Sequence, residues 1–178
     1  MQKPEASLND PPFDNFLFRV GAYSHFRQEV LYQASLAKLI RSHSRYKYLL
    51  MAHNQDQCRA LGRLIGSPTD QPLKSLINSY FKGFIEAISK PASRKNHTNA
   101  LLHILDYLKG KLPLTARDHI IKIIHNYNKG LIPLATPLSL LKHGSAYIKD
   151  QRYLDPYPKK LALYFNHSPM LTSKASKL

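Results

Sequence analysis

The strongest constraint on the fold is an apolar stripe in residues 73–90, where hydrophobic side chains recur at three- and four-residue steps. An α-helix turns by about 100° per residue, so this spacing places them all on one face. The stripe consists of Leu73, Leu76, Ile77, Tyr80, Phe81, Phe84, Ile85 and Ile88. Pro91 cannot continue a helix, and we therefore expect a core-facing helix that ends just before it.

Helical periodicity also runs through most of the remaining chain. We expect one or two helices over residues 14–39, with a break at Gly21, and further helices over 44–65, 92–110, 115–129 and 136–142. Thr115 is expected to cap the start of the segment 115–129, and Gly130 is expected to follow its end. Thr136 and Pro137 are expected to begin the last one. No convincing strand pair and no internal repeat are present, so the predicted fold class is all-α, a single compact domain of six or seven helices.

The length of 178 residues fits one domain. Three prolines (Pro4, Pro11 and Pro12) predict a flexible lead-in over residues 1–12. A Ser- and Lys-rich composition predicts a disordered tail over residues 166–178, which leaves residues 13–165 for the helical domain.

The single cysteine, Cys58, excludes an internal disulfide and a four-cysteine zinc or iron–sulfur site within one chain. We expect it to be a packed small side chain, although Arg59 and Arg63 would favour the thiolate. No segment approaches the ~18 apolar residues of a membrane span, and no membrane partner is expected. One thiol and an N-terminus without an apolar core predict a cytoplasmic protein.

The charge is strongly positive and unevenly distributed. There are 26 Lys and Arg residues against 11 Asp and Glu, a formal net charge of +15. Residues 1–40 sum to zero, whereas residues 41–66 carry +4 and residues 92–113 carry +3. Concentrated positive charge is typical of a polyanion-binding protein, the alternative being a solvated basic surface.

Catalytic signatures are missing from the sequence. The GRLIG segment at residues 62–66 lacks the Lys-Ser/Thr pair of a phosphate-binding loop. His97 and His103 are six residues apart, as are His119 and His125, whereas a helical zinc site uses a four-residue spacing. We expect no metal and no cofactor. We expect His97 to be a hydrogen-bonded core residue, and His119 and His125 to lie on a basic helix face.

Four ordered blocks of sequence carry a family resemblance. They are SRYKYLLMAH at 44–53 with LGRL at 61–64, PASRKNHTNALLHILDYLK at 91–109, YNKGLIPLATPLSLLKH at 127–143 and QRYLDPYP at 151–158. Together they resemble the bacterial YbgA-like family over roughly residues 14–165. The chain departs from the family pattern at Asp106, where Gly is usual, and at Leu108, where Phe is common. It also departs at Gly144, because an aromatic residue often occupies this position after the Lys-His pair.

The resemblance implies an accessory role. In larger relatives this domain follows a desulfidase domain that removes sulfur from thiouracil or from 4-thiouridine in tRNA, using cysteines that hold an iron–sulfur cluster. Residues 8–23 resemble the end of that catalytic domain, but one cysteine cannot hold its cluster. The resemblance therefore implies a non-catalytic nucleic-acid-binding module that holds tRNA for a desulfidase or RNA-modification partner.

Nine polar residues in the matched blocks are the candidate nucleic-acid contacts, because they are hard to explain as core residues. They are Arg45, Lys47, Arg63, Arg94, Lys95, Asn99, His103, Lys142 and His143. With 11 Tyr and no Trp, any platform for stacked bases would consist of Tyr, His or Arg.

Each candidate contact also has a structural alternative. Arg45 could pair with a buried carboxylate or cap a helix, and Asn99 and His103 could hydrogen-bond to a neighbouring loop. The pair Arg94 and Lys95 opposes the helix dipole at a helix start, which favours a ligand role.

Two other functions remain open at the level of sequence. One is a protein–protein adaptor for a separate desulfidase or repair enzyme. The other is an enzyme acting on nucleic acid, with His97, His103 or His143 transferring a proton.

Overall fold

The structure is a computed structural model, which describes residues 11–67, 70–142 and 145–154. Within these ranges it contains eight α-helices, one π-helical turn and no strand, which confirms the predicted all-α class. The elements are α1 (Pro11–Phe26), the π-helical turn η1 (Arg27–Leu31), α2 (Leu36–His53), α3 (Gln55–Gly66), α4 (Leu73–Ala87), α5 (Arg94–Tyr107), α6 (Leu114–Asn128), α7 (Ala135–Leu141) and α8 (Ala146–Lys149).

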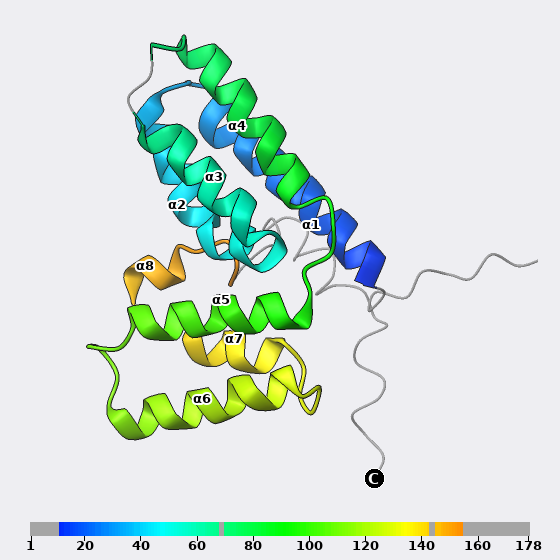
Figure 1. Ribbon diagram of the computed structural model, residues 1–178, viewed down its shortest axis with the longest axis vertical. Coiled ribbons are helices and arrows are strands. Elements are labelled where there is room, and N and C mark those ends of the chain that lie inside the picture. Colours follow the sequence, from blue (N-terminus) through cyan, green and yellow to red (C-terminus); the bar gives the residue numbers. More distant parts are fainter. Residues whose placement is uncertain (1–10, 68–69, 143–144, 155–178) are drawn as a thin grey trace, which may run out of the picture.

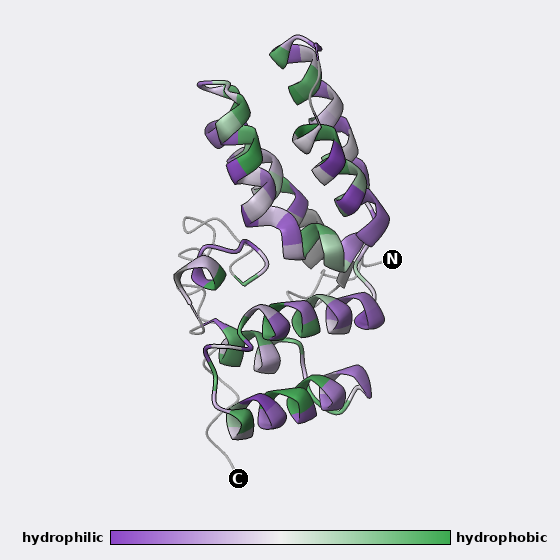
Figure 2. Cartoon of the chain, turned by 60° about the vertical axis from the view of Figure 1, so that its left-hand side comes forward, coloured by the Kyte–Doolittle hydropathy of each residue, from purple (hydrophilic) through white to green (hydrophobic). Residues whose placement is uncertain are grey.

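The helices form two groups that meet at α5. The upper group in Figure 1 contains α1 to α4, and the lower group contains α5, α6 and α7. Helix α5 packs against α2 on one side and against α6 and α7 on the other. Hydrophobic and hydrophilic residues alternate along each helix (Figure 2), as expected for helices that bury one face. Helix α5 therefore lies between both groups.

The predicted apolar stripe forms the core of the upper group. Tyr80 and Phe84 on α4 are fully buried, and Phe26 at the end of α1 stacks on both. The ring centroid of Phe26 lies 5.8 Å from that of Tyr80 and 5.6 Å from that of Phe84. Helix α4 ends at Ala87, and Ile88 is buried just beyond it.

The first helices break at other positions than expected. Gly21 is buried inside α1, and the chain turns instead at residues 32–35, after η1. Ser35 caps α2 by accepting a hydrogen bond from the backbone N–H of Lys38 at 3.2 Å. The expected segment 44–65 is divided by Asn54, whose side chain accepts from the N–H of Gln57 at 3.0 Å. These side-chain caps satisfy free N–H groups at each new helix start.

The later helices begin earlier than expected. Helix α6 follows Pro113, so Thr115 lies inside its first turn rather than capping it. Helix α7 begins at Ala135, which places Thr136 and Pro137 in its first turn. Proline, which lacks a backbone N–H, is tolerated there because an N–H in the first turn has no partner within the helix. Gly130 has a φ of +83° directly after the C-cap of α6, as predicted for a left-handed helix end.

The number of helices exceeds the predicted six or seven because α2 and α3 are separate and α8 was not predicted. Pro11 and Pro12, assigned to the lead-in, instead form the first turn of α1. Residues 1–10 and the predicted tail over 166–178 lie outside the described residues. No helix in the described ranges has the length and hydrophobicity needed to cross a membrane.

Candidate nucleic-acid interface

A polar stripe runs along the outer side of α5. Lys95, Asn99 and His103 follow one another at four-residue steps, so they lie on neighbouring turns of one face. Lys95 and His103 are exposed and Asn99 is half-buried. The opposite face is fully buried through Leu101 and Ile104, and this burial fixes the orientation of the stripe.

Asn99 and His103 line a shallow pocket between α5 and α6, with a volume of about 310 Å³. Its other lining residues are Leu102, Leu105, Asp106, Arg117 and Ile121. Arg117 Nη2 lies 3.9 Å from Asp106 Oδ1, an ion pair between the two helices. The pocket therefore offers an amide, an imidazole and a paired guanidinium to a ligand.

The outer face of α6 carries further basic residues, among them His119 and His125, which the sequence placed on a basic helix face. His119, Lys122, His125 and Lys129 are all exposed, at three- and four-residue steps. Neither lysine forms an ion pair with another described residue, nor does Lys95 on α5. Residues 94–142 contain eight Lys and Arg against two acidic residues. We call the exposed residues Lys95, His103, His119, Lys122, His125 and Lys129, together with the half-buried Asn99, the α5–α6 surface.

Arg94 has a local role that the sequence argument denied. Its Nη1 donates to the backbone oxygen of Tyr127 at 2.8 Å, and its guanidinium carbon lies 4.9 Å from the centre of the Tyr127 ring. The acceptor belongs to the last turn of α6, where the helix dipole is negative and a cation is stabilising. The helix-dipole argument considered only α5 and therefore left out this local role, in which Arg94 links the start of α5 to the end of α6.

Arg45 belongs to a cluster of ion pairs in the upper group. It pairs with Glu29, and its Nε lies 3.1 Å from Asp150 Oδ1. Arg152 reaches the same Glu29 at 3.7 Å, and its backbone N–H donates to the oxygen of Arg45 at 2.9 Å. The side chain of Arg45 is only 16% exposed. Of the roles that the sequence left open for Arg45, the structure supplies the partners for an ion pair with carboxylates, at Glu29 and Asp150.

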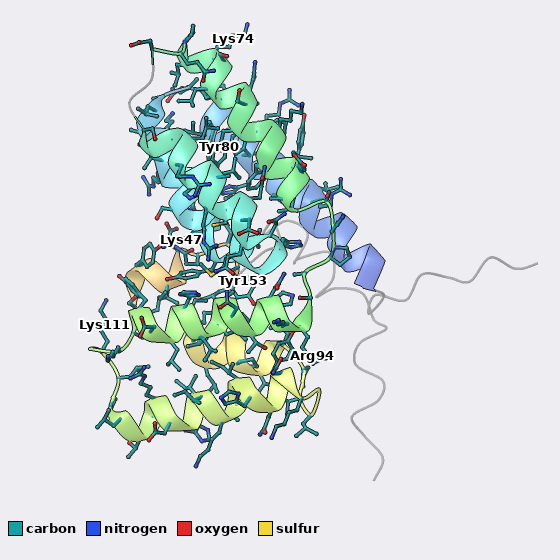
Figure 3. All side chains as sticks on the ribbon, viewed as in Figure 1. Lys47, Lys74, Tyr80, Arg94, Lys111 and Tyr153 are labelled. Atoms are coloured by element: carbon teal, nitrogen blue, oxygen red, sulfur yellow. The ribbon has the colours of Figure 1, made fainter. Side chains whose placement is uncertain are left out.

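The α5–α6 surface does not include the remaining candidate contacts that the structure describes. Lys47 on α2, Arg63 on α3 and Lys142 at the C-cap of α7 are exposed on separate elements. Figure 3 shows Lys47 above α5 and Arg94 at the right-hand end of α5. His143 lies outside the described residues. Only Lys95, Asn99 and His103 of the nine share one face.

The buried histidine and cysteine are structural residues, as predicted. His97 Nδ1 shares a hydrogen bond with the Tyr153 hydroxyl at 2.7 Å, and the two rings stack at 5.7 Å. Burial, helped by the charges of His53 and Arg94, lowers the pKa of His97 to about 4, so its ring is neutral near pH 7. Burial raises the pKa of the Cys58 thiol despite nearby cations. The described residues contain no group of three or more potential metal ligands.

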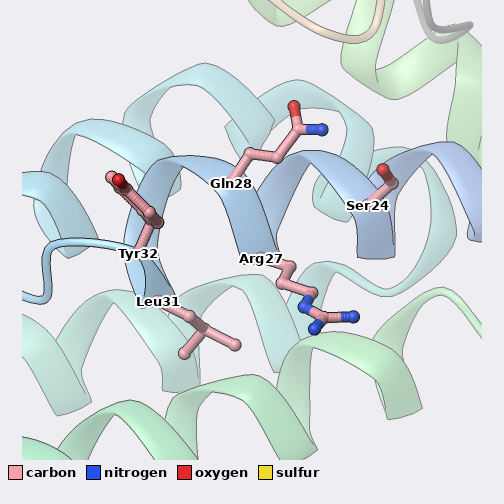
Figure 4. A pocket seen from close by; sticks show the side chains of 5 residues that line it. All are labelled: Ser24, Arg27, Gln28, Leu31 and Tyr32. Carbon is pink, nitrogen blue, oxygen red and sulfur yellow. The ribbon is translucent and has the colours of Figure 1, made fainter.

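A second pocket, of about 600 Å³, lies along η1 (Figure 4). It is lined by Ser24, Arg27, Gln28, Leu31 and Tyr32 from neighbouring turns. The sequence reasoning missed this site, since nothing in the local sequence distinguishes a π-helical turn from an α-helix. π-Helical turns occur often at functional sites.

The fold and the α5–α6 surface define a small, basic, all-helical protein. The family described as "Protein of unknown function (DUF1722)" matches residues 47–158. The chain is also 30% identical over 164 residues to "Uncharacterized protein YbgA" of Escherichia coli (strain K12), which covers 89% of this chain and 96% of that relative. The chain therefore belongs to the YbgA-like, DUF1722 family, as the four sequence blocks indicated. No solved structure matches it.

Proposed function

We propose that the chain is a non-catalytic nucleic-acid-binding module that holds RNA, and tRNA above all, for a desulfidase or another RNA-modifying partner. The observation that carries the proposal is the α5–α6 surface, where Lys95, Lys122 and Lys129 are exposed and have no acidic partner among the described residues. The preference for tRNA rests on the family resemblance, in which this domain follows desulfidases that act on thiouridine.

The physical mechanism is phosphate neutralisation. A lysine that meets a phosphate releases condensed counterions, so the affinity falls as the salt concentration rises. Lys122 and Lys129 are seven residues apart on α6, or about 10 Å along the helix axis, and can meet separate phosphates. Asn99 and His103 supply hydrogen-bonding groups beside them, which suits a structured RNA recognised by its shape.

The test is a binding titration with total tRNA and with duplex DNA across a series of salt concentrations. We expect preferential tRNA binding with a log–log salt slope of several units. The double variant Lys122→Gln/Lys129→Gln should make this slope shallower by roughly 1.5 units, since each phosphate contact contributes about 0.7–0.9.

The matched control is Lys74→Gln/Lys82→Gln, which removes the same charge from exposed positions on α4. Lys74 lies at the opposite end of the molecule from α6 (Figure 3). The control should keep the wild-type slope. An equal loss of salt slope in both double variants, or equally weak binding to every polyanion, would contradict the proposal. Either result would mean that the positive charge only forms a solvated surface.

A second candidate function is a protein–protein adaptor, favoured by the apolar residues exposed where η1 meets α2. Leu31, Leu36 and Ile40 are all exposed there, and Tyr32 is 84% exposed. An adaptor would bind a purified desulfidase-domain protein in a salt-insensitive manner. The variant Tyr32→Ser/Ile40→Ser should abolish that binding in calorimetry while leaving any tRNA binding unchanged.

A further inference from the structure

Three tyrosines from distant parts of the chain meet beside α8. Tyr48 comes from α2, Tyr107 is the last residue of α5, and Tyr147 lies on α8. The ring centroids of Tyr107 and Tyr147 are 4.8 Å apart, and those of Tyr48 and Tyr147 are 6.5 Å apart. We call this cluster the tyrosine platform.

The platform is buried at its base and open at its edge. Tyr48 is 4% exposed, whereas Tyr107 is 44% exposed. The Tyr107 ring packs against the Tyr147 ring at an interplanar angle of 47° and stays partly open to solvent. Single-stranded nucleic acids stack their bases on accessible aromatic rings of this kind.

Two lysines lie against the platform. Lys111 Nζ is 4.8 Å from the centre of the Tyr107 ring, and Lys47 Nζ is 5.9 Å from that of Tyr48. Figure 3 shows Lys47 above α5 and Lys111 at its left-hand end. Both are exposed, so each ammonium can leave its ring and reach a phosphate on a flexible stem.

The acidic residues nearest in sequence to the platform have other partners. Asp106, next to Tyr107, pairs with Arg117 across the α5–α6 pocket. Asp150, which follows α8, pairs with Arg45. Neither carboxylate forms an ion pair with Lys47 or Lys111, which leaves the field at the platform positive within the described part of the chain.

We propose that the tyrosine platform receives an unpaired RNA base on the ring of Tyr107, while Lys111 and Lys47 contact the adjoining phosphates. This inference rests on the proposed function and specifies its ligand as an unpaired nucleotide. Stacking of a base on an aromatic ring is more favourable than an exposed contact between a lysine and that ring. The base therefore displaces the Lys111 ammonium, which remains close enough to neutralise the phosphate.

The test uses an RNA hairpin with 2-aminopurine in its loop, because the fluorescence of this base changes when it stacks on an aromatic ring. A fully paired RNA duplex that contains the same analogue is the comparison. We expect the wild-type protein to quench the fluorescence of 2-aminopurine in the hairpin loop. We also expect it to bind the paired duplex less tightly than the hairpin. Tyr107→Leu should weaken hairpin binding about tenfold, whereas Tyr107→Phe, which keeps the ring, should stay within about twofold.

Two further variants complete the test. Tyr23→Leu removes a tyrosine of α1 that is exposed to the same degree as Tyr107, and it should leave hairpin binding unchanged. Lys111→Gln should weaken hairpin binding and make its salt slope shallower by about 0.7. This variant decides the question if Tyr107→Leu alters the circular dichroism spectrum, since it leaves the tyrosine packing in place.

The outcomes separate the platform from the proposed function. If tRNA still binds the wild-type chain, but neither Tyr107→Leu nor Lys111→Gln weakens hairpin binding, the platform is overturned and the proposed function stands. If the wild-type chain binds neither tRNA nor the hairpin, both proposals are overturned.

Discussion

Buried histidines make the stability of this protein depend on pH at the level of single residues. Burial is the main cause that lowers the pKa values of His25, His43 and His97 to about 4, below the ~6.5 of an unfolded chain. The unfolded state therefore binds more protons between these values, and the free energy of unfolding falls as the pH drops through this window. We expect a loss of roughly 1–2 kcal/mol per histidine between pH 7 and pH 5.

Denaturant unfolding of His97→Gln at both pH values checks this expectation. The variant should be less stable at pH 7, because the hydrogen bond to Tyr153 is lost, yet its stability should depend less on pH. Ser79→Ala, at an exposed position on α4 and without a group that titrates in this range, should keep the wild-type pH dependence. Equal pH slopes in wild type and His97→Gln would contradict the lowered pKa, because they would show that His97 binds protons equally in the folded and unfolded states.

Neighbouring basic residues on α5 should respond differently to substitution. Arg94→Ala removes a charge-assisted hydrogen bond to Tyr127 and a cation–π contact, and should lower the free energy of unfolding by about 1–2 kcal/mol. Lys95→Ala should leave thermal stability unchanged and weaken tRNA binding instead. A stable Arg94→Ala protein that has lost tRNA affinity would restore the ligand role that the sequence alone favoured.

At the scale of elements, the close approach of α3 and α4 depends on one glycine. A β-carbon placed on Gly83 would lie 2.8 Å from Gln57 Nε2 and 2.9 Å from Leu61 Cδ2. Gly83→Leu would insert a whole side chain into this contact and should destabilise the protein by about 3 kcal/mol. Gly66→Leu, at the end of α3 with open space around it, should be nearly neutral in the same thermal unfolding assay. A Gly83→Leu protein as stable as Gly66→Leu would contradict this, because it would mean that α3 and α4 can move apart at little cost.

Helix faces could be predicted from the sequence, whereas helix ends could not. The stripe on α4 and the polar stripe of Lys95, Asn99 and His103 both follow from the angle between successive residues. Asn54 separates α2 from α3, and both helices bury apolar residues on either side of it. The apolar pattern therefore continues across Asn54, and the periodicity does not reveal the end of α2. A cap is set by one side-chain hydrogen bond, and the same residue types occur inside helices.

The roles of the two site arginines depend on tertiary structure. Arg45 finds its partners at Glu29 and Asp150, and Arg94 finds Tyr127, all far away in the chain. Local rules describe only the helix on which a residue lies, and they assigned Arg94 no partner for that reason. The three tyrosines of the platform are likewise brought together by the packing of α2, α5 and α8, without a shared sequence motif.

At the scale of the whole molecule, α5 packs against both groups of helices, and we expect it to join them into one cooperative unit. Leu101 and Leu105 on α5 are almost completely buried, and α5 packs on α2 as well as on α6. Loss of this packing should therefore destabilise both groups together. Leu101→Ala should cost about 2–5 kcal/mol through the cavity that it creates.

Hydrogen exchange resolved by residue distinguishes shared from separate unfolding. In Leu101→Ala, the protection of core amides in α4 and in α6 should fall by the same free energy, because both open only in global unfolding. A fall confined to α6 would mean that the lower group opens by itself. The α5–α6 surface and the tyrosine platform both include residues of α5, so one cooperative unit would hold the two proposed RNA contacts in a fixed relation. A lower group that opens separately would let them move apart, and the two sets of substitutions would then weaken RNA binding independently.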